Sequence, residues 1–509
     1  MKKLSLLFFF IFQTLIFGQS QNLAELAKGD YIGFNAVFDQ KDNLFGYVSL
    51  YSYGKSGDKT KKFEYVILDK NLNPIANKEF EGDITAKSYY AYMDFRGKII
   101  LKPSQIDNFA VKNKDFFIPR SKEITLKENS IANKIYYDYK EGKFTEIAEP
   151  KNYRADQKEE KAERKANGFS YQSIVSEIEE GGFLAIEFHD YGNYINHNNL
   201  IKFDENQKEM WRYEYNTSGD KKINEQISIL EKNKNLIYMM LQKNEKKLKT
   251  FQLLVLDMKT GKEVHKKPIT GLSGETLDQI SSMGSYSFGS IKNDKTFDDK
   301  IVLLGRIYDK TFLSKGFARM VVDRKTFEID TKEITFNSIK NLIPNLEDNG
   351  YVEKGYFLDP RDAYFMKDGS IGILMEKYKP QGEYSASKTT DLVYVFTDKD
   401  FNVSGVKIFE KEKTKYANSD YLFSQYLNEG EDVVFFYRDY QKDTTTKEKN
   451  WNLYINTLIG GKFNQEMVPI SAKDDYIVYP YVGKEGYILL REMNEKEKFN
   501  KIRLERLNY

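Results

Sequence analysis

The sequence contains no cysteine among its 509 residues. A disulfide framework is therefore excluded, as is a lipid anchor attached to a cysteine. Tryptophan is scarce, with two residues, so stacked indoles for sugar binding are weakly supported. There are three histidines, and the spacing of His189 and His197 matches no zinc pattern. We expect burial alone to stabilise the fold, with no metal and no cofactor.

An excess of charge of one sign is also lacking. The formal net charge is +2, and Lys2 and Lys3 are the only charged residues among the first twenty. Removal of that segment brings the net charge to zero. Because nucleic-acid binding favours a basic surplus, the composition predicts no nucleic-acid partner.

Long hydrophobic runs are missing except at the N-terminus. There, Lys2 and Lys3 precede an apolar stretch from Leu4 to Phe17, and Gly18-Gln-Ser20 follows as a small-x-small site. This order is typical of a secretory signal peptide, and the stretch is short for a membrane span. We expect residues 1–20 to be removed. The mature chain would then be an exported monomer, periplasmic or extracellular, without a transmembrane segment.

A repeated strand-turn-strand unit runs through the rest of the chain. In each copy an apolar run ends on an aspartate, a polar turn follows, and a second short strand begins. The aspartates lie 53 to 75 residues apart, at Asp69, Asp138, Asp204, Asp257, Asp323 and Asp398. A seventh hairpin turns at Gly460-Gly461 without an aspartate. A short carboxylate can accept from backbone amides two residues on, so we expect these aspartates to stabilise the turns.

A strand repeat of this size predicts an all-β fold, a β-propeller of four-stranded antiparallel blades. Eight blades fit the mature chain, with seven as the alternative, and residues 21–509 are expected to form one domain. The last unit, 475–507, offers only three strands, and the segment 22–30 is the candidate for the fourth. The strands expected in the first blade are 31–38, 43–53, 61–69 and 73–80.

Two segments resemble the repeat of quinoprotein-type propellers. Asp257-Met-Lys-Thr260-Gly261 matches the first half of that motif, with His265 at the position of its docking tryptophan, and Asp204 with Trp211 matches loosely. The resemblance implies a propeller. Quinone-dependent members commonly carry a vicinal cysteine pair, which this chain cannot supply. Non-catalytic relatives serve as scaffolds at the bacterial outer membrane, and by analogy they are the nearer model.

Loop lengths are uneven, because the first and third turns of each repeat are tight and the other connections are long. In a propeller the long connections share one face, where ligands usually bind. Second strands often end there on a polar-x-tyrosine pattern. The candidate binding residues are Tyr53, His189, Tyr191, Arg306, Tyr308, Glu376, Tyr378, Arg438 and Tyr440. The tyrosines could simply pack between blades. Arg306, Glu376 and Arg438, in successive blades, could hold an anionic group or form a self-satisfied ion network.

These candidate residues are compatible with two functions. The first is a non-catalytic binding or scaffold module for a protein or envelope component. The alternative is a propeller hydrolase or lyase acting on a carbohydrate or lactone through Glu376, Asp309 and Asp439. An enzyme predicts convergent acids with shifted pKa values, whereas a scaffold predicts an apolar or aromatic patch.

Overall fold

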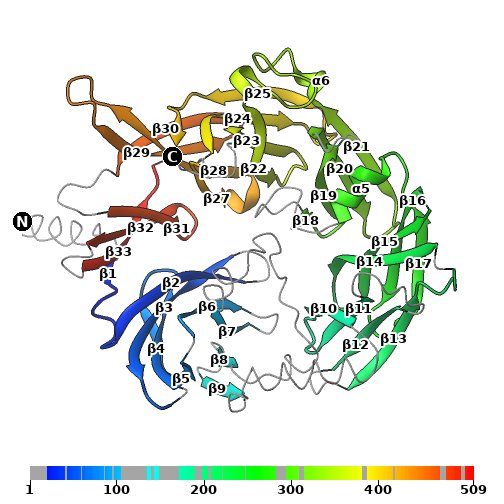
Figure 1. The fold of residues 1–509 in the computed structure, drawn as a ribbon, viewed down its shortest axis with the longest axis horizontal. Helices are drawn as coiled ribbons and strands as arrows, with labels where there is room; N and C mark the ends of the chain where they lie inside the picture. The colour runs from blue at the N-terminus through cyan, green and yellow to red at the C-terminus, as the bar shows by residue number, and fades with distance from the viewer. Residues whose placement is uncertain are drawn as a thin grey trace, which may run out of the picture. The chain divides into compact units, whose positions relative to one another are not determined.

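The computed structural model describes residues 20–508 with internal gaps. The segments outside the description are 40–42, 59, 85, 94–96, 105–133, 139–142, 148–170, 190–197, 205–207, 221, 247, 282–293, 309–313, 381–386, 416–418, 471–476 and 495–498. Contacts divide the chain into two compact units. Unit 1 holds strands β1–β9 and β31–β33, and unit 2 holds β10–β30 (Figure 1).

Unit 1 contains three antiparallel four-stranded sheets, with the orders β2-β3-β4-β5, β6-β7-β8-β9 and β1-β33-β32-β31. The strands are β1 (Ser20–Asn22), β2 (Asp30–Phe38), β3 (Leu44–Lys55), β4 (Thr60–Asp69), β5 (Pro74–Asp83), β6 (Ser88–Met93), β7 (Lys98–Ser104), β8 (Lys134–Asp138), β9 (Lys143–Ile147), β31 (Ile477–Val482), β32 (Tyr487–Asn494) and β33 (Phe499–Arg506).

Unit 2 contains five more sheets, each a meander of consecutive strands, and in one of them a short extra strand, β26, pairs with β24. The strands are β10 (Tyr171–Glu177), β11 (Phe183–His189), β12 (Asn198–Phe203), β13 (Glu209–Tyr215), β14 (Ile223–Lys232), β15 (Leu236–Glu245), β16 (Leu248–Asp257), β17 (Glu263–Pro268), β18 (Asp294–Thr296), β19 (Lys300–Tyr308), β20 (Ser314–Asp323), β21 (Ile329–Thr335), β22 (Phe357–Phe365), β23 (Ile371–Lys379), β24 (Lys388–Thr397), β25 (Val403–Phe409), β26 (Thr414–Lys415), β27 (Tyr421–Leu427), β28 (Asp432–Lys442), β29 (Lys449–Ile459) and β30 (Lys462–Pro469). The described helices are α5 (Gly274–Ser281), α6 (Phe336–Ile339) and the 3₁₀ turns η1 (Glu353–Gly355) and η2 (Asn428–Gly430).

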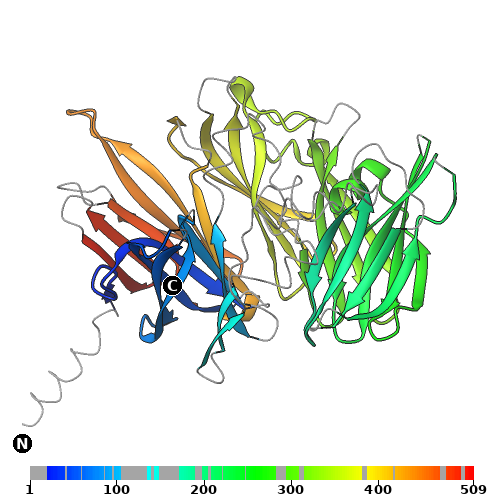
Figure 2. The same cartoon turned by 60° about the horizontal axis from the view of Figure 1, so that its bottom comes forward.

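The prediction of an all-β propeller with eight four-stranded blades is confirmed by these eight sheets. Figure 2 shows the twist of the strands within each sheet. The four strands expected in the first blade lie within a few residues of β2 to β5. That residues 21–509 form one domain stays a prediction.

The N-terminal segment completes the last blade, but three residues form its strand and most of 22–30 does not. Strand β1 pairs with β33, with Asn22 opposite Lys501. Leu23 follows and is fully buried, and its carbonyl accepts a hydrogen bond from the hydroxyl of Tyr51 (2.6 Å). The chain then turns, with the Glu25 amide donating to the carbonyl of Asn22 (3.0 Å), before β2 begins. The predicted location of the strand was therefore wrong by a few residues.

Consecutive apolar residues in the third strands face two neighbouring blades. In β16, Leu253 and Val255 belong to one apolar cluster, while Leu254 and Leu256 belong to another. Successive side chains of a strand point to opposite faces. A blade covered on both faces therefore requires an unbroken apolar run, which is the pattern in the sequence.

The hydrogen bonds of the aspartate turns explain why aspartate ends these strands. The Asp257 carboxylate accepts from the amides of Lys259 (3.0 Å) and Thr260 (2.7 Å) and from the Thr260 hydroxyl (2.8 Å). These donors hold the pKa of Asp257 below its usual value. Asp323 and Asp443 receive the same pair of amides two and three residues on. The predicted role is confirmed for Asp69, Asp257, Asp323 and Asp398, each of which accepts from the amide two residues on, and it stays a prediction for Asp138 and Asp204, whose turns lie at least partly outside the described residues. Asp443 adds a copy in the long β28–β29 turn.

An aromatic side chain from one blade lies on the aspartate turn of the next. The indole nitrogen of Trp211 donates to the carbonyl of Met258 (3.0 Å). Its ring covers Gly261, whose positive φ of 68° and close ring contact both exclude a larger residue. In the following blade His265 stacks on Phe327 with ring centres 4.9 Å apart. The two positions singled out by the sequence motif thus both join neighbouring blades of unit 2.

Candidate functional site

The polar-x-tyrosine pairs lie near the ends of second strands, as the repeat pattern predicts. Tyr53 lies in β3, Arg306 and Tyr308 in β19, Glu376 and Tyr378 in β23, and Arg438 and Tyr440 in β28. His189 ends β11, but its side chain and all of Tyr191 lie outside the described residues. Tyr53 belongs to unit 1, and the other described residues of the set belong to unit 2.

Tyr53 is the exposed member of the set in unit 1, with 37% of its surface accessible. Its hydroxyl donates to the Glu64 carboxylate, and the Lys62 ammonium lies 5.3 Å from its ring centre. Tyr53 is thus held by local contacts on the surface of its own blade.

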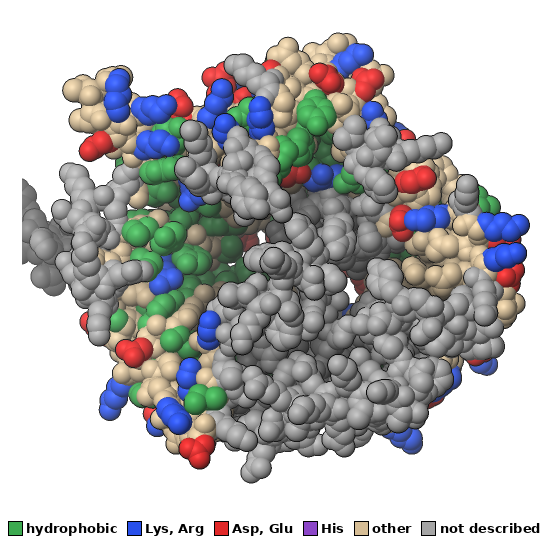
Figure 3. All heavy atoms as spheres, in the orientation of Figure 1, with side chains coloured by type: hydrophobic (Ala, Val, Ile, Leu, Met, Phe, Trp, Pro, Cys, Tyr) green, Lys and Arg blue, Asp and Glu red, His purple; other side chains and the backbone are tan. Residues whose placement is uncertain are grey.

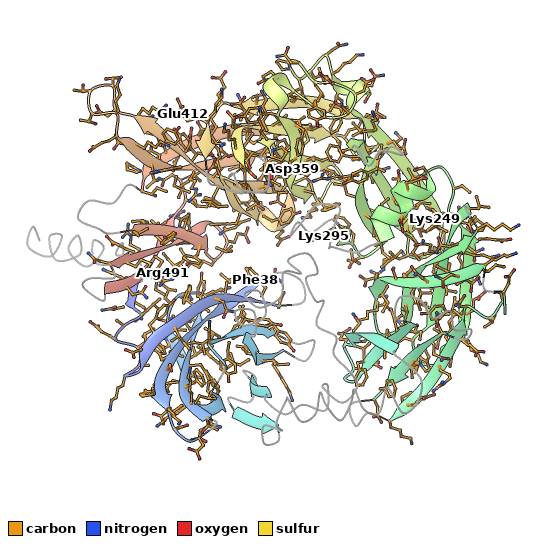
Figure 4. The ribbon with its side chains drawn as sticks, viewed as in Figure 1. Phe38, Lys249, Lys295, Asp359, Glu412 and Arg491 are labelled. Carbon is orange, nitrogen blue, oxygen red and sulfur yellow. The ribbon has the colours of Figure 1, made fainter. Side chains whose placement is uncertain are left out.

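In unit 2, Arg306 and Glu376 are joined through two residues that the sequence pattern did not single out. Asp359 accepts from Arg306 (2.9 Å) and pairs with Arg361 (3.0 Å). The Nε of Arg361 donates to Oε2 of Glu376 (2.8 Å). Asp359 and Arg361 lie in β22, beside β23. Figure 4 labels Asp359 at this end of the ion network.

The Glu376 carboxylate is completely buried, and each of its oxygens has two partners. Its Oε2 also accepts from the Ser419 hydroxyl (2.8 Å), and its Oε1 accepts from the Asp420 amide (3.1 Å). The ammonium of Lys411 lies 3.5 Å from Oε1. Burying a carboxylate is tolerable only when such partners satisfy it, so Glu376 is held as the centre of a polar cluster.

Asp420 links this cluster to Arg438. Its Oδ2 receives the Lys411 ammonium (2.6 Å) and the hydroxyls of Thr389 (2.8 Å) and Thr414. The Nε of Arg438 lies 3.4 Å from Oδ1. Burial alone would raise the pKa of Asp420, but Lys411 and the two hydroxyl donors outweigh it and hold that pKa below its usual value.

The three charged residues of the predicted arc therefore belong to one chain of ion pairs. It runs through Arg306, Asp359, Arg361, Glu376, Lys411, Asp420 and Arg438. In this arrangement the described carboxylates, rather than an external anion, neutralise the arginines. Asp359 and Arg361 could have been suspected from Asp-Pro-Arg in the strand paired with β23. The repeat pattern did not point to Lys411 or Asp420, because both lie in the connection between two blades.

The tyrosines at these strand ends pack closely. The Tyr378 hydroxyl lies 2.8 Å from the Ser387 hydroxyl, and the ring meets Phe357 edge-on at 5.3 Å. Tyr440 is 3% exposed, and its hydroxyl donates to the carbonyl of Lys413 (2.7 Å). Tyr308 is half-buried. Tyr378 contacts residues of its own blade, and Tyr440 contacts the connection that precedes β27, so packing of these tyrosines between blades stays a prediction.

Arg438 is the most exposed charged side chain of the network, at 39%, whereas Glu376, Lys411 and Asp420 are inaccessible. Its guanidinium lies 5.4 Å from the Trp451 ring centre. Trp451 in turn meets Tyr440 at 5.1 Å. The β28–β29 hairpin, orange in Figures 1 and 2, projects from its blade, and Figure 3 shows Lys and Arg side chains gathered over it. Arg438 and Trp451 thus form a cationic, aromatic surface at the base of this hairpin.

The acids considered for catalysis are enclosed where they are described. Asp309 lies outside the described residues. Asp439 is 6% exposed, accepts from the Glu412 amide with both oxygens (3.2 Å each), and has its pKa raised by burial. Glu412 is labelled in Figure 4. Glu376 and Asp439 both neighbour Lys411, but neither carboxylate is open to solvent.

A shallow hollow of about 600 Å³ lies elsewhere in unit 2, on the connection before β22, and includes neither Glu376 nor Asp439. It is lined by Asn345, Glu347, Asn349, Tyr351, Val352, Glu353 and Gly355. The described residues contain no group of three or more histidines and acids placed to hold a metal. No helix in the described part of the chain is long and apolar enough to cross a membrane.

Comparisons with known proteins give distant structural likenesses. The chain is similar to the β-propeller domain of the Trilobed protease from Pyrococcus furiosus at 12% identity and a TM-score of 0.31, covering 88% of this chain and 98% of that one. It is similar to a eukaryotic initiation factor at 9% identity and 0.31, covering 92% and 97%. For the WD40 domain of SCAP from fission yeast the values are 9% and 0.22, covering 74% and 87%. No family model and no curated protein matches the chain. Likenesses this distant carry no information about function.

Proposed function

We propose that this protein is an exported, non-catalytic propeller that binds a protein or envelope component at the base of the β28–β29 hairpin. The proposal rests on which charged side chain of the ion network reaches the surface. Glu376 and Asp420 are enclosed and neutralised, while Arg438 reaches the surface beside Trp451. Exposed arginine next to an aromatic ring is the combination enriched at binding hot spots.

An enzyme acting through these acids would need at least one of them to reach its substrate. Asp439 comes nearest, because its pKa is raised, but it is 6% exposed and its oxygens bind the Glu412 amide. The enclosed geometry therefore favours binding over hydrolysis or elimination at this place.

Capture from the envelope fraction of the source cells tests the proposal. Arg438→Ala should weaken partner capture by roughly 1–3 kcal/mol, the cost of leaving a buried polar group of the partner unsatisfied. Arg503→Ala is the matched control, because Arg503 is 36% exposed and also paired with carboxylates. Equal capture by wild type and Arg438→Ala would contradict the proposed surface.

Export has its own test. The N-terminal residue of the protein isolated from its native source should be Gln21, since cleavage after Ser20 removes the apolar segment. In the structure Gln21 and Asn22 pair with Ile502 and Lys501, so the cleaved chain keeps two of the three β1 residues. A native chain that retains Lys2 and Lys3 would exclude this processing.

A further inference from the structure

Unit 2 contains a buried lysine whose ammonium lies beside two buried carboxyl groups. Lys411, Asp420 and Glu376 have side chains with no accessible surface. Lys411 Nζ lies 2.6 Å from Asp420 Oδ2 and 3.5 Å from Glu376 Oε1. The proposed binding surface, Arg438 with Trp451, contains none of these three groups. A primary amine, a carboxyl group and a second carboxyl beside both are the components of an amide-forming site.

We propose that Lys411 and Asp420 join through an intramolecular isopeptide bond, with Glu376 as the proton carrier. The amide links Lys411 Nζ to Asp420 Cγ. The residues lie nine positions apart in sequence, on the connection that leaves β25 and enters β27. The bond would fasten this connection beneath the ion network. In a chain without cysteine it would be a covalent cross-link that needs no oxidant.

The distances favour attack on the carboxyl carbon. A nitrogen 2.6 Å from one carboxyl oxygen lies within roughly 3–3.5 Å of the carbon bearing that oxygen, the separation of a near-attack geometry. Holding two reacting groups in this way corresponds to effective concentrations of about 10⁵ M or more. Both groups are carried by backbone that is tied down on either side. The Lys411 amide donates to Asp391 (3.1 Å), and the Asp420 amide donates to Glu376 (3.1 Å).

Burial changes the balance between the ion pair and the amide. An ammonium and a carboxylate lose their hydration when they are enclosed, whereas a neutral amide and a released water molecule carry no such penalty. Proton transfer within the cluster gives the uncharged amine that can act as the nucleophile. Glu376 accepts the proton from the Lys411 nitrogen, because its Oε1 is the nearer oxygen to both Lys411 and the Asp420 amide.

Two threonine hydroxyls lie where negative charge would develop during this reaction. Thr389 and Thr414 both donate hydroxyl hydrogen bonds to Asp420 Oδ2. These donors stabilise negative charge on Oδ2 in the tetrahedral intermediate, and Oδ2 then stays as the carbonyl oxygen of the amide. The C–Oδ1 bond breaks, and Oδ1 leaves as water after receiving the two protons lost by the Lys411 nitrogen. One ammonium and one carboxylate thus give one amide and one water, and Glu376 is unchanged.

The test is the mass of the full chain under denaturing conditions, followed by a tryptic map. We expect the chain to be lighter than its sequence by one water molecule. Trypsin should not cleave after an acylated Lys411. The map should therefore contain a branched species that joins the peptides 408–413 and 416–438 through Lys411 and Asp420.

A second buried lysine serves as an internal control in the same digest. Lys377 lies 2.8 Å from Glu353 and 3.0 Å from Asp391, but those carboxylates are 34% and 20% exposed. Solvent can stabilise both as ions, so cleavage after Lys377 should proceed normally. Glu376→Gln should leave Lys411 and Asp420 in linear peptides, because glutamine cannot carry the proton.

Each outcome decides the proposal. A wild-type chain with its full sequence mass overturns it, as does a lighter chain whose Lys411 and Asp420 peptides are linear. The second case would trace the loss to another site, such as cyclisation of Gln21, which releases ammonia instead of water. Lys411→Met should restore the full mass, and a branched peptide that persisted in this variant would assign the linkage elsewhere.

Discussion

Strand β23 is buried on both faces, but one face is apolar and the other carries a charged residue. Ile371, Ile373 and Met375 point into an apolar cluster shared with the preceding blade. On the opposite face Leu374 joins a second apolar cluster, and Glu376, two residues on, enters the ion network. One short strand therefore carries an apolar interface and a charged interface of comparable burial.

The two faces should respond differently to substitution. An apolar interface loses energy gradually, in proportion to the atoms and the cavity removed. A buried ion network loses much more when one partner is deleted, because the remaining charge is left without compensation. On the charged face of β23, stability should depend on which residue is present. On the apolar face, it should depend on the volume of the side chain.

Deleting the central carboxylate should have the largest effect. Glu376→Ala leaves Arg361 without the buried carboxylate that it pairs with. We expect a loss of about 3–5 kcal/mol in the free energy of unfolding, measured by urea denaturation. Glu376→Gln keeps the shape and some hydrogen bonds, and should lose less. Equal stability of the alanine variant and wild type would show that the network contributes nothing to holding the blades.

Truncation on the apolar face should cost less. Ile373 is fully buried, and Ile373→Ala should lower the free energy of unfolding by about 2–4 kcal/mol in the same urea experiment. Ile373→Val, at about 0.5–1.5 kcal/mol, calibrates the dependence on volume. A Val variant as damaging as the Ala variant would mean that shape rather than removed volume controls this interface.

A pH series distinguishes the faces in another way. Asp362 lies on the charged face of β22, opposite Leu374, and accepts from the hydroxyls of Ser424 (2.5 Å) and Tyr421. Burial nevertheless raises its pKa. A raised pKa makes the contribution of Asp362 to stability greatest below the pKa of the unfolded carboxyl. That contribution is lost as the pH rises through the higher, folded pKa.

Asp362→Asn removes this titration. The variant should therefore gain stability relative to wild type as the pH rises from about 4 to 8, by about 1.4 kcal/mol for each unit by which the pKa is raised. Melting temperatures of the two proteins across that range supply the measurement. A constant difference at every pH would show that Asp362 titrates at the same pH in the folded and unfolded chains.

The apolar architecture was accessible from sequence because it repeats. Strand ends and apolar runs recur along the chain, and aspartate turns recur in six of the repeats. Each of these features has a local cause that a single copy reveals. Even the alignment of Arg306, Glu376 and Arg438 followed from this period. Their equivalent strand positions do bring them into one network.

The partners in the network were not accessible in the same way. Lys411 and Asp420 lie in a connection between blades, where no period relates one residue to another. Their enclosure depends on how β26 folds back against β24, which is a single event in the chain. The direction of Arg438 likewise depends on Trp451 across the hairpin, a pairing set by register and not by repeat position.

The exposed end of the network should show the smallest effect on stability. Arg438 is 39% exposed and reaches Asp420 at 3.4 Å, while two threonine hydroxyls already donate to the other oxygen of Asp420. Arg438→Ala should therefore lower the free energy of unfolding by no more than about 1 kcal/mol, the range for exposed ion pairs. The melting temperature should be close to that of wild type, with partner capture weakened. A large drop in the melting temperature with capture intact would show that Arg438, like Glu376, stabilises the fold. Arg438 would then have no role in binding.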